Sequence, residues 1–134
     1  MSWFILAWQR AADFSGRSRR KEYWYFNLLN GIAFLFLFLF AIPFGEHEKP
    51  STIALGLIFI YSLIVFIPAL SVTIRRLHDI GRSGWWYFIA FIPLIGGLIL
   101  FVFTLVDSEP YANPWGQDPK ASERVIVPPY ATPR

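Results

Sequence analysis

Three long apolar segments constrain the fold of this chain more than any other feature. They cover residues 23–44, 52–74 and 85–106, and none of them contains Asp, Glu, Lys or Arg. At about 1.5 Å of rise per residue, each segment would form a helix of about 33 Å, which crosses a hydrocarbon layer about 30 Å thick. We therefore predict an all-α membrane protein with three transmembrane helices.

The composition and the backbone chemistry of the first segment support this class. Hydrophobic residues make up 55% of the chain and charged residues only 16%, which is unusual for a soluble domain. Residues 34–40 alternate Phe with Leu, a period of two that in water indicates a strand. A lone strand in lipid leaves its backbone unpaired, whereas a helix satisfies its own hydrogen bonds, so a helix is expected here.

The basic residues predict how the chain is oriented in the membrane. Three of them, Arg75, Arg76 and Arg82, lie between the second and third segments, while the loop after the first segment has only Lys49. Because cytoplasmic loops are enriched in Lys and Arg, we expect the N-terminus and the second loop in the cytoplasm. Three crossings then place the first loop and the C-terminal tail on the periplasmic or external side. Five further basic residues precede the first segment, namely Arg10, Arg17, Arg19, Arg20 and Lys21.

The regions that flank the apolar segments are predicted to differ from each other in structure. Trp3, Phe4 and Trp8 fall on one helical face with Arg10 opposite, which favours an interfacial amphipathic helix over residues 3–14. After residue 106 the chain becomes rich in Pro, Asn and Gly, which is typical of irregular structure. We predict a single transmembrane domain over residues 1–120 and a flexible Pro-rich tail over residues 121–134.

The strongest polar signal is the charged hairpin R-R-L-H-D-I-G-R-S-G-W-W at residues 75–86. Asp79 can pair with Arg75 or Arg76 one helical turn earlier, and Gly81 would end the helix as a left-handed cap. One interpretation is a tight cytoplasmic turn with orienting arginines. The other is a site for an anion or a lipid head group. His78 and Asp79 could also form an acid–base pair, although sequence neighbours do not face each other on a helix.

The polar residues that flank the segments are expected to meet at one leaflet. The first helix enters from the cytoplasm, the second leaves there and the third re-enters. Unpaired charge beside hydrocarbon is costly, so each acidic residue should contact an arginine, and the surplus arginines should attract anionic head groups. The candidate site comprises Arg17, Glu22, Asn27, Asn30, Arg75, Arg76, His78, Asp79 and Arg82.

Several kinds of chemistry are not expected from this sequence. The chain has no cysteine, and it lacks the zinc-protease, dinucleotide-binding and phosphate-loop motifs. We predict no catalytic, cofactor-binding or metal-binding residue and no nucleic-acid partner. Pro68 and Pro93 are expected to kink two spans at similar depth, and kinks of this kind favour packing against a neighbouring helix. We therefore expect the chain to form a homo-oligomer or to pack with another membrane protein.

Three sequence blocks resemble a bacterial family of inner-membrane proteins, the domain of unknown function 805 (YhaH type). The first block is F-S-G-R-S-R-R-K-E-Y-W at residues 14–24, and the second is the hairpin at residues 75–86. The third is N-P-W-G-Q-D-P-K at residues 113–120, with Trp115 where tyrosine is common in the family. The resemblance implies a bacterial inner-membrane protein with a three-helix plan, and it implies no activity.

Three functional hypotheses are consistent with these features. The favoured hypothesis is a non-enzymatic membrane interaction protein that binds anionic lipid head groups or a protein partner through the arginine-rich face. The alternative is a channel or carrier for a small solute, which would require a homo-oligomer because three helices cannot enclose a path. The third is an interfacial lipid-modifying enzyme that uses His78 and Asp79.

Overall fold

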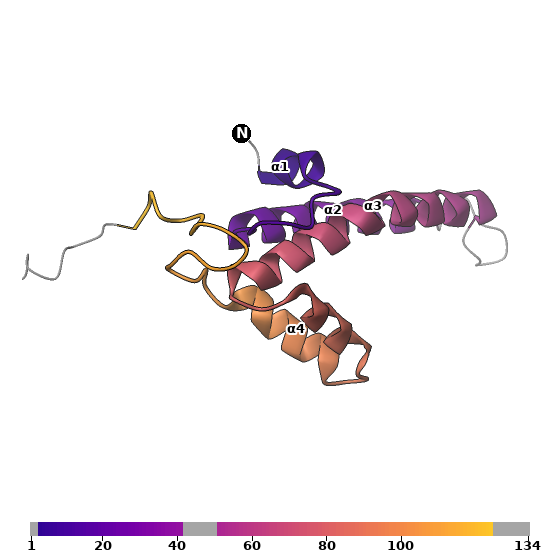
Figure 1. Ribbon diagram of the computed structural model, residues 1–134. Helices are drawn as coiled ribbons and strands as arrows, with labels where there is room; N and C mark the ends of the chain where they lie inside the picture. The colour runs from indigo at the N-terminus through magenta and orange to yellow at the C-terminus, as the bar shows by residue number, and fades with distance from the viewer. Residues whose placement is uncertain (1–2, 42–50, 125–134) are drawn as a thin grey trace, which may run out of the picture.

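The chain is helical in the computed structural model, which describes residues 3–41 and 51–124 (Figure 1). The all-α class predicted from the sequence is therefore confirmed for the described ranges. In chain order the helices are α1 (Trp3–Gln9), α2 (Arg20–Ala41), α3 (Thr52–Asp79), the 3₁₀-helix η1 (Gly84–Phe91) and α4 (Gly96–Leu105).

Helices α2 and α3 form a long antiparallel pair that makes the body of the fold (Figure 1). The Ser51 amide donates to the Ala41 carbonyl at one end of the pair, and the Ser18 amide donates to the Arg75 carbonyl at the other. Both helices are long and apolar enough to cross a membrane, and few of their apolar side chains are buried inside the protein. Lipid is the environment that can cover so much exposed apolar surface.

The predicted third transmembrane helix is wrong, because residues 85–106 do not form one continuous helix. Within the described ranges only α2 and α3 qualify as candidate spans. The chain forms η1, turns at residues 92–95, and returns as α4 beside η1 (Figure 1). Pro93 has no amide hydrogen to continue a helix, and Leu94 adopts a left-handed φ of 67°. Pro93 is thus part of a turn and not a kink within a span.

Gly96 lets the two arms of this hairpin approach each other closely. A Cβ at Gly96 would lie 1.7 Å from the carbonyl oxygen of Ile89, so no other residue fits there without displacing the backbone. Gly97 has open space around it. The eight residues of η1 and the ten of α4 each extend about 15 Å, roughly half of a hydrocarbon layer.

The hairpin returns the chain to the end of the bundle where α2 begins and α3 ends. The Val106 carbonyl accepts a hydrogen bond from Arg20 Nε at 3.0 Å, and residues 107–124 then fold across that end. The expectation that the tail and the N-terminal region lie on opposite sides is therefore wrong for residues up to 124. The remaining tail residues and the loop at residues 42–50 lie outside the described ranges.

Helix α1 is shorter than predicted and packs along the α2–α3 pair. It ends at Gln9 and not near residue 14, and its buried Ala7 contributes to a small apolar core with Phe26, Val65 and Val72. The Ser71 hydroxyl donates to the Asp13 carbonyl at 2.6 Å and so holds the segment that follows α1.

Candidate functional site

A buried network of charged side chains occupies the end of the bundle where α2 begins and α3 ends. Helix α3 changes from apolar to charged over its last turn, yet Arg75, Arg76 and Asp79 are each no more than 1% exposed. The helix stops there because Gly81 adopts a φ of 71°, as predicted for a left-handed cap. The Glu109 carboxylate lies 2.6 Å from where a Cβ at Gly81 would stand, so glycine also makes room for the tail.

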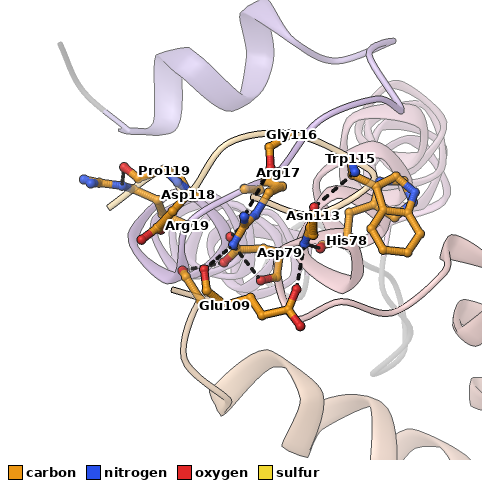
Figure 2. Close-up of polar contacts among 12 residues, drawn as sticks. Arg17, Arg19, His78, Asp79, Glu109, Asn113, Trp115, Gly116, Asp118 and Pro119 are labelled. Carbon is orange, nitrogen blue, oxygen red and sulfur yellow. Dashed lines mark hydrogen bonds and ion pairs between the residues drawn. The ribbon is translucent and has the colours of Figure 1, made fainter. Parts of the chain in front are cut away.

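Arg17 is the centre of this network (Figure 2). Its Nε donates to Asp79 Oδ1 at 3.1 Å, and its Nη2 donates to the Asp79 carbonyl at 3.2 Å. The same guanidinium donates to the tail carbonyls of Glu109 at 2.6 Å, Tyr111 at 2.7 Å and Gly116 at 3.3 Å. The planar, five-donor guanidinium thus joins the end of α3 to the tail, a role for which the three-donor lysine is poorly suited.

Asp79 accepts bonds from three directions and neutralises two arginines. Besides Arg17, its carboxylate pairs with Arg76, three residues earlier on α3, and accepts from the Ser108 hydroxyl at 2.5 Å. Arg76 also donates to the Val106 carbonyl, where α4 ends. A buried carboxylate with charged and neutral donors is stable only because all of them are present together.

The second ion pair of the network joins α3 to α2. Arg75 Nη1 lies 2.6 Å from Glu22 Oε1, and both side chains are buried. Arg75 Nε and Nη2 have no hydrogen-bond partner among the described residues, and neither has the Ser18 hydroxyl. Arg75 therefore has unused donors, but its complete burial keeps them from the surface.

His78 lies beside the network and does not share its contacts. Its Nδ1 is 3.2 Å from the Gly16 carbonyl oxygen, and its ring stacks on Trp115 of the tail, with centroids 4.7 Å apart (Figure 2). Asn113 donates to the His78 carbonyl at 2.9 Å. Because the Asp79 carboxylate contacts Arg17, Arg76 and Ser108 instead, these contacts give no support to an acid–base pair of His78 with Asp79.

The structure brings together only part of the set predicted from the sequence. Arg17, Glu22, Arg75, Arg76 and Asp79 form the network through direct ion pairs. The expected pairing of each acidic residue of the set with an arginine is thus confirmed.

The remaining members of that set lie apart from the arginines. Asn27 donates to the Tyr23 carbonyl of its own helix, and Asn30 accepts from the Tyr61 hydroxyl of α3 at 2.7 Å. Arg82 lies over the rings of Trp86 and Phe103. No hydrogen bond among the described residues links Asn27, Asn30 or Arg82 to the network.

Sequence reasoning missed the contribution of the tail. Ser108, Glu109, Asn113 and Gly116 all contact the network or its neighbours, but the prediction placed the tail across the membrane. The signal was present in the block at residues 113–120, whose Asn and Gly form a tight turn closed by reciprocal backbone bonds between Asn113 and Gly116.

Exposed ion pairs surround the network and shift the pKa of two carboxyl groups. A hydrogen bond from the Ser15 hydroxyl and the charge of Arg10 hold the pKa of Asp13 at about 2, below the usual 3.8. A bond from the Lys120 ammonium likewise lowers the pKa of Asp107 to about 2. Two further pairs, Arg19 with Glu123 and Arg20 with Asp107, connect the residues before and at the start of α2 to the tail.

This arrangement is suited to holding segments of the chain together. Each acidic side chain of the network is paired, and the arginines donate mainly to carboxylates and backbone carbonyls of the chain itself. Removing any partner from such a network leaves an uncompensated buried charge, which is strongly destabilising.

An exposed apolar helix pair, a half-length hairpin and a buried charged network at one end define the class of protein as an α-helical membrane protein. The chain belongs to the family described as "Protein of unknown function (DUF805)", which matches residues 11–117. The family resemblance predicted from the sequence is confirmed.

Two relatives from Escherichia coli (strain K12) are similar over almost their whole length. The chain is 40% identical over 120 residues to "Inner membrane protein YhaI". The aligned residues cover 90% of this chain and 97% of that protein. The identity to "Inner membrane protein YhaH" is also 40% over 120 residues, covering 90% and 98%. No solved structure matches this chain.

Proposed function

We propose that this protein is a non-enzymatic protein of the bacterial inner membrane that binds anionic lipid head groups at its cytoplasmic face. The binding groups are the exposed basic side chains around the buried network, and the network is the scaffold that holds them. The names of the two Escherichia coli relatives support the location in the inner membrane.

The observation that carries the proposal is the environment of Arg82. Its guanidinium lies 5.1 Å from the ring centroid of Trp86 and 5.6 Å from that of Phe103, and its side chain is exposed. It forms no ion pair with any carboxylate in the described ranges. A cation held on aromatic faces at the base of an apolar hairpin is well placed to contact a phosphate at the membrane interface.

The distribution of basic residues supports the cytoplasmic orientation of this face. Within residues 3–41 and 51–124, every Lys and Arg belongs to residues 10–21, 75–82 or 120–124, which meet at the same end of the bundle. The positive-inside tendency places this end in the cytoplasm. In our proposal the N-terminal segment and residues 107–124 are therefore both cytoplasmic.

Retention of phosphatidylglycerol in nanodiscs tests the proposal. Arg82→Gln should reduce the retention of phosphatidylglycerol relative to phosphatidylethanolamine about fivefold, because a basic residue near an anionic surface contributes about 1 kcal/mol. Lys21→Gln removes a second exposed cation and should act in the same direction. Arg82→Lys keeps the charge and serves as the matched control, with retention close to wild type. Unchanged phosphatidylglycerol enrichment in both Gln variants would refute head-group binding at these residues.

A further inference from the structure

A cavity separate from the arginine network lies where α3, the loop after it and η1 meet. Its volume is about 400 Å³, and its wall is formed mainly by apolar and aromatic side chains, including Ile74, Trp85 and Phe88. His78 and Ser83 supply the polar groups of the wall. Binding sites for small molecules commonly combine an apolar wall with a few fixed polar groups in this way.

The contacts of His78 determine which hydrogen bond it can offer to this cavity. Its Nδ1 faces the Gly16 carbonyl oxygen, which can only accept, so Nδ1 carries the proton. In the neutral ring Nε2 is then an acceptor. A Cβ at Gly84 would lie 3.5 Å from Nε2, so this nitrogen faces the side where Gly84 lines the cavity. Stacking on Trp115 and 7% exposure keep the ring in this orientation.

Ser83 supplies the complementary group. Its oxygen accepts from the Trp85 amide at 3.4 Å, which leaves the hydroxyl hydrogen free to donate. No lining residue is charged, so neither a phosphate nor an ammonium group would find an opposite charge there. A hydroxyl group matches the cavity, because it donates to His78 Nε2 and accepts from Ser83.

The location of the cavity indicates a ligand from the membrane. His78 belongs to the last turn of α3, where the apolar span gives way to charged residues. Trp85 is 78% exposed and Phe88 is 56% exposed, so the aromatic wall faces the surroundings of the hairpin. We infer that this cavity binds the free hydroxyl of an uncharged membrane lipid, represented by 1,2-diacylglycerol, with its acyl chains against the apolar hairpin. This ligand carries no phosphate, so the inference is independent of anionic-lipid binding.

Photo-crosslinking in nanodiscs tests this site with a diacylglycerol that carries a diazirine near its glycerol. We expect crosslinks at Trp85 and Phe88, and competition by unlabelled diacylglycerol but not by its O-methyl ether, which cannot donate to His78. A polyprenol competitor distinguishes a general alcohol site from a glycerol site. His78→Phe should reduce crosslinking about fivefold, as expected for one lost hydrogen bond.

Two further variants keep the test decisive if His78→Phe does not fold. Ile74→Trp fills the cavity while keeping the His78 side chain in the protein, and it should abolish the crosslinks. Ile67→Trp adds the same volume to the same helix at an exposed position that does not line the cavity, and it should leave the crosslinks unchanged. Equal competition by the methyl ether, or crosslinks that persist in Ile74→Trp, would overturn the inference.

Discussion

The Arg17 guanidinium and the Asp79 carboxylate lie 3.1 Å apart, although 62 residues separate them in the sequence. Their side chains are 2% and 0% exposed, so the pair is shielded from water. Arg17 lies shortly before α2, which begins at Arg20, and Asp79 is the last residue of α3. The pair therefore fixes the two helix ends relative to each other and, through the carbonyls that Arg17 also contacts, fixes the tail.

Breaking this pair should destabilise the protein strongly. Arg17→Gln leaves the Asp79 carboxylate buried with one cation fewer and should reduce the free energy of unfolding by about 3–5 kcal/mol. Arg17→Lys should recover little of this loss, because an ammonium cannot reach the same five acceptors. Denaturation in detergent micelles measures both effects.

A half-exposed pair provides the control for the Arg17 variants. Arg10 and Asp13 form a 2.8 Å ion pair whose side chains are 30% and 34% exposed, so Arg10→Gln should cost less than about 1 kcal/mol. Limited proteolysis should also cleave residues 107–124 faster in Arg17→Gln than in Arg10→Gln. Equal sensitivity of the two variants would contradict the role of Arg17 in holding the tail.

The hairpin of η1 and α4 should depend on Gly96 and tolerate change at Gly97. Gly96→Ala places a methyl group against the Ile89 carbonyl and should cost about 1–3 kcal/mol or more, because the two backbones must separate. Gly97→Ala enters open space and should be neutral or slightly stabilising, since alanine favours the helix. Thermal unfolding in nanodiscs compares them, and similar midpoints would argue against a close hairpin.

Residues 107–124 should be accessible from the same side of the membrane as the N-terminal segment. The chain has no cysteine, so single-cysteine variants can be labelled without removing native thiols. Lys21→Cys and Tyr111→Cys occupy exposed positions at the same end and should react with an impermeant maleimide only in inverted vesicles. Thr52→Cys, at the exposed first residue of α3 and the opposite end of the pair, should react only in right-side-out vesicles. Labelling of Tyr111→Cys from the side of Thr52→Cys would restore a third crossing.

Acid should weaken the contacts that Asp107 makes with Lys120 of the tail and with Arg20 of α2. Its pKa is lowered from 3.8 to about 2 in the folded protein, chiefly by the bond from Lys120. A lowered folded pKa means that the stabilisation is complete above the unfolded value and disappears as the pH falls through about 2. Since the Asp107 side chain is 55% exposed, the contribution should remain below about 1 kcal/mol. The difference in unfolding free energy between wild type and Asp107→Asn should accordingly shrink between pH 5 and pH 2, and a constant difference would exclude this pair as the cause.

The sequence predicted the helical class and several local features, because these depend on local chemistry. Hydropathy and length identified α2 and α3, and Gly81 predicted the end of α3. The hairpin was missed because Pro93 was interpreted as a kink within a continuous span and the close approach at Gly96 was not anticipated. The prediction of three crossings placed the tail and the N-terminal region on opposite sides of the membrane. The contacts of the tail with Arg17 were therefore not anticipated.

The half-length hairpin gives the protein an unequal profile across the bilayer. Within the described ranges only α2 and α3 are long enough to cross a bilayer, whereas η1 and α4 add cross-section at the end where Arg17 and the tail lie. The molecule is therefore a wedge, wide in one leaflet and narrow in the other. A wedge of this kind fits best where the membrane curves so that the leaflet around its wide end is expanded. Membrane curvature should therefore influence where the protein gathers.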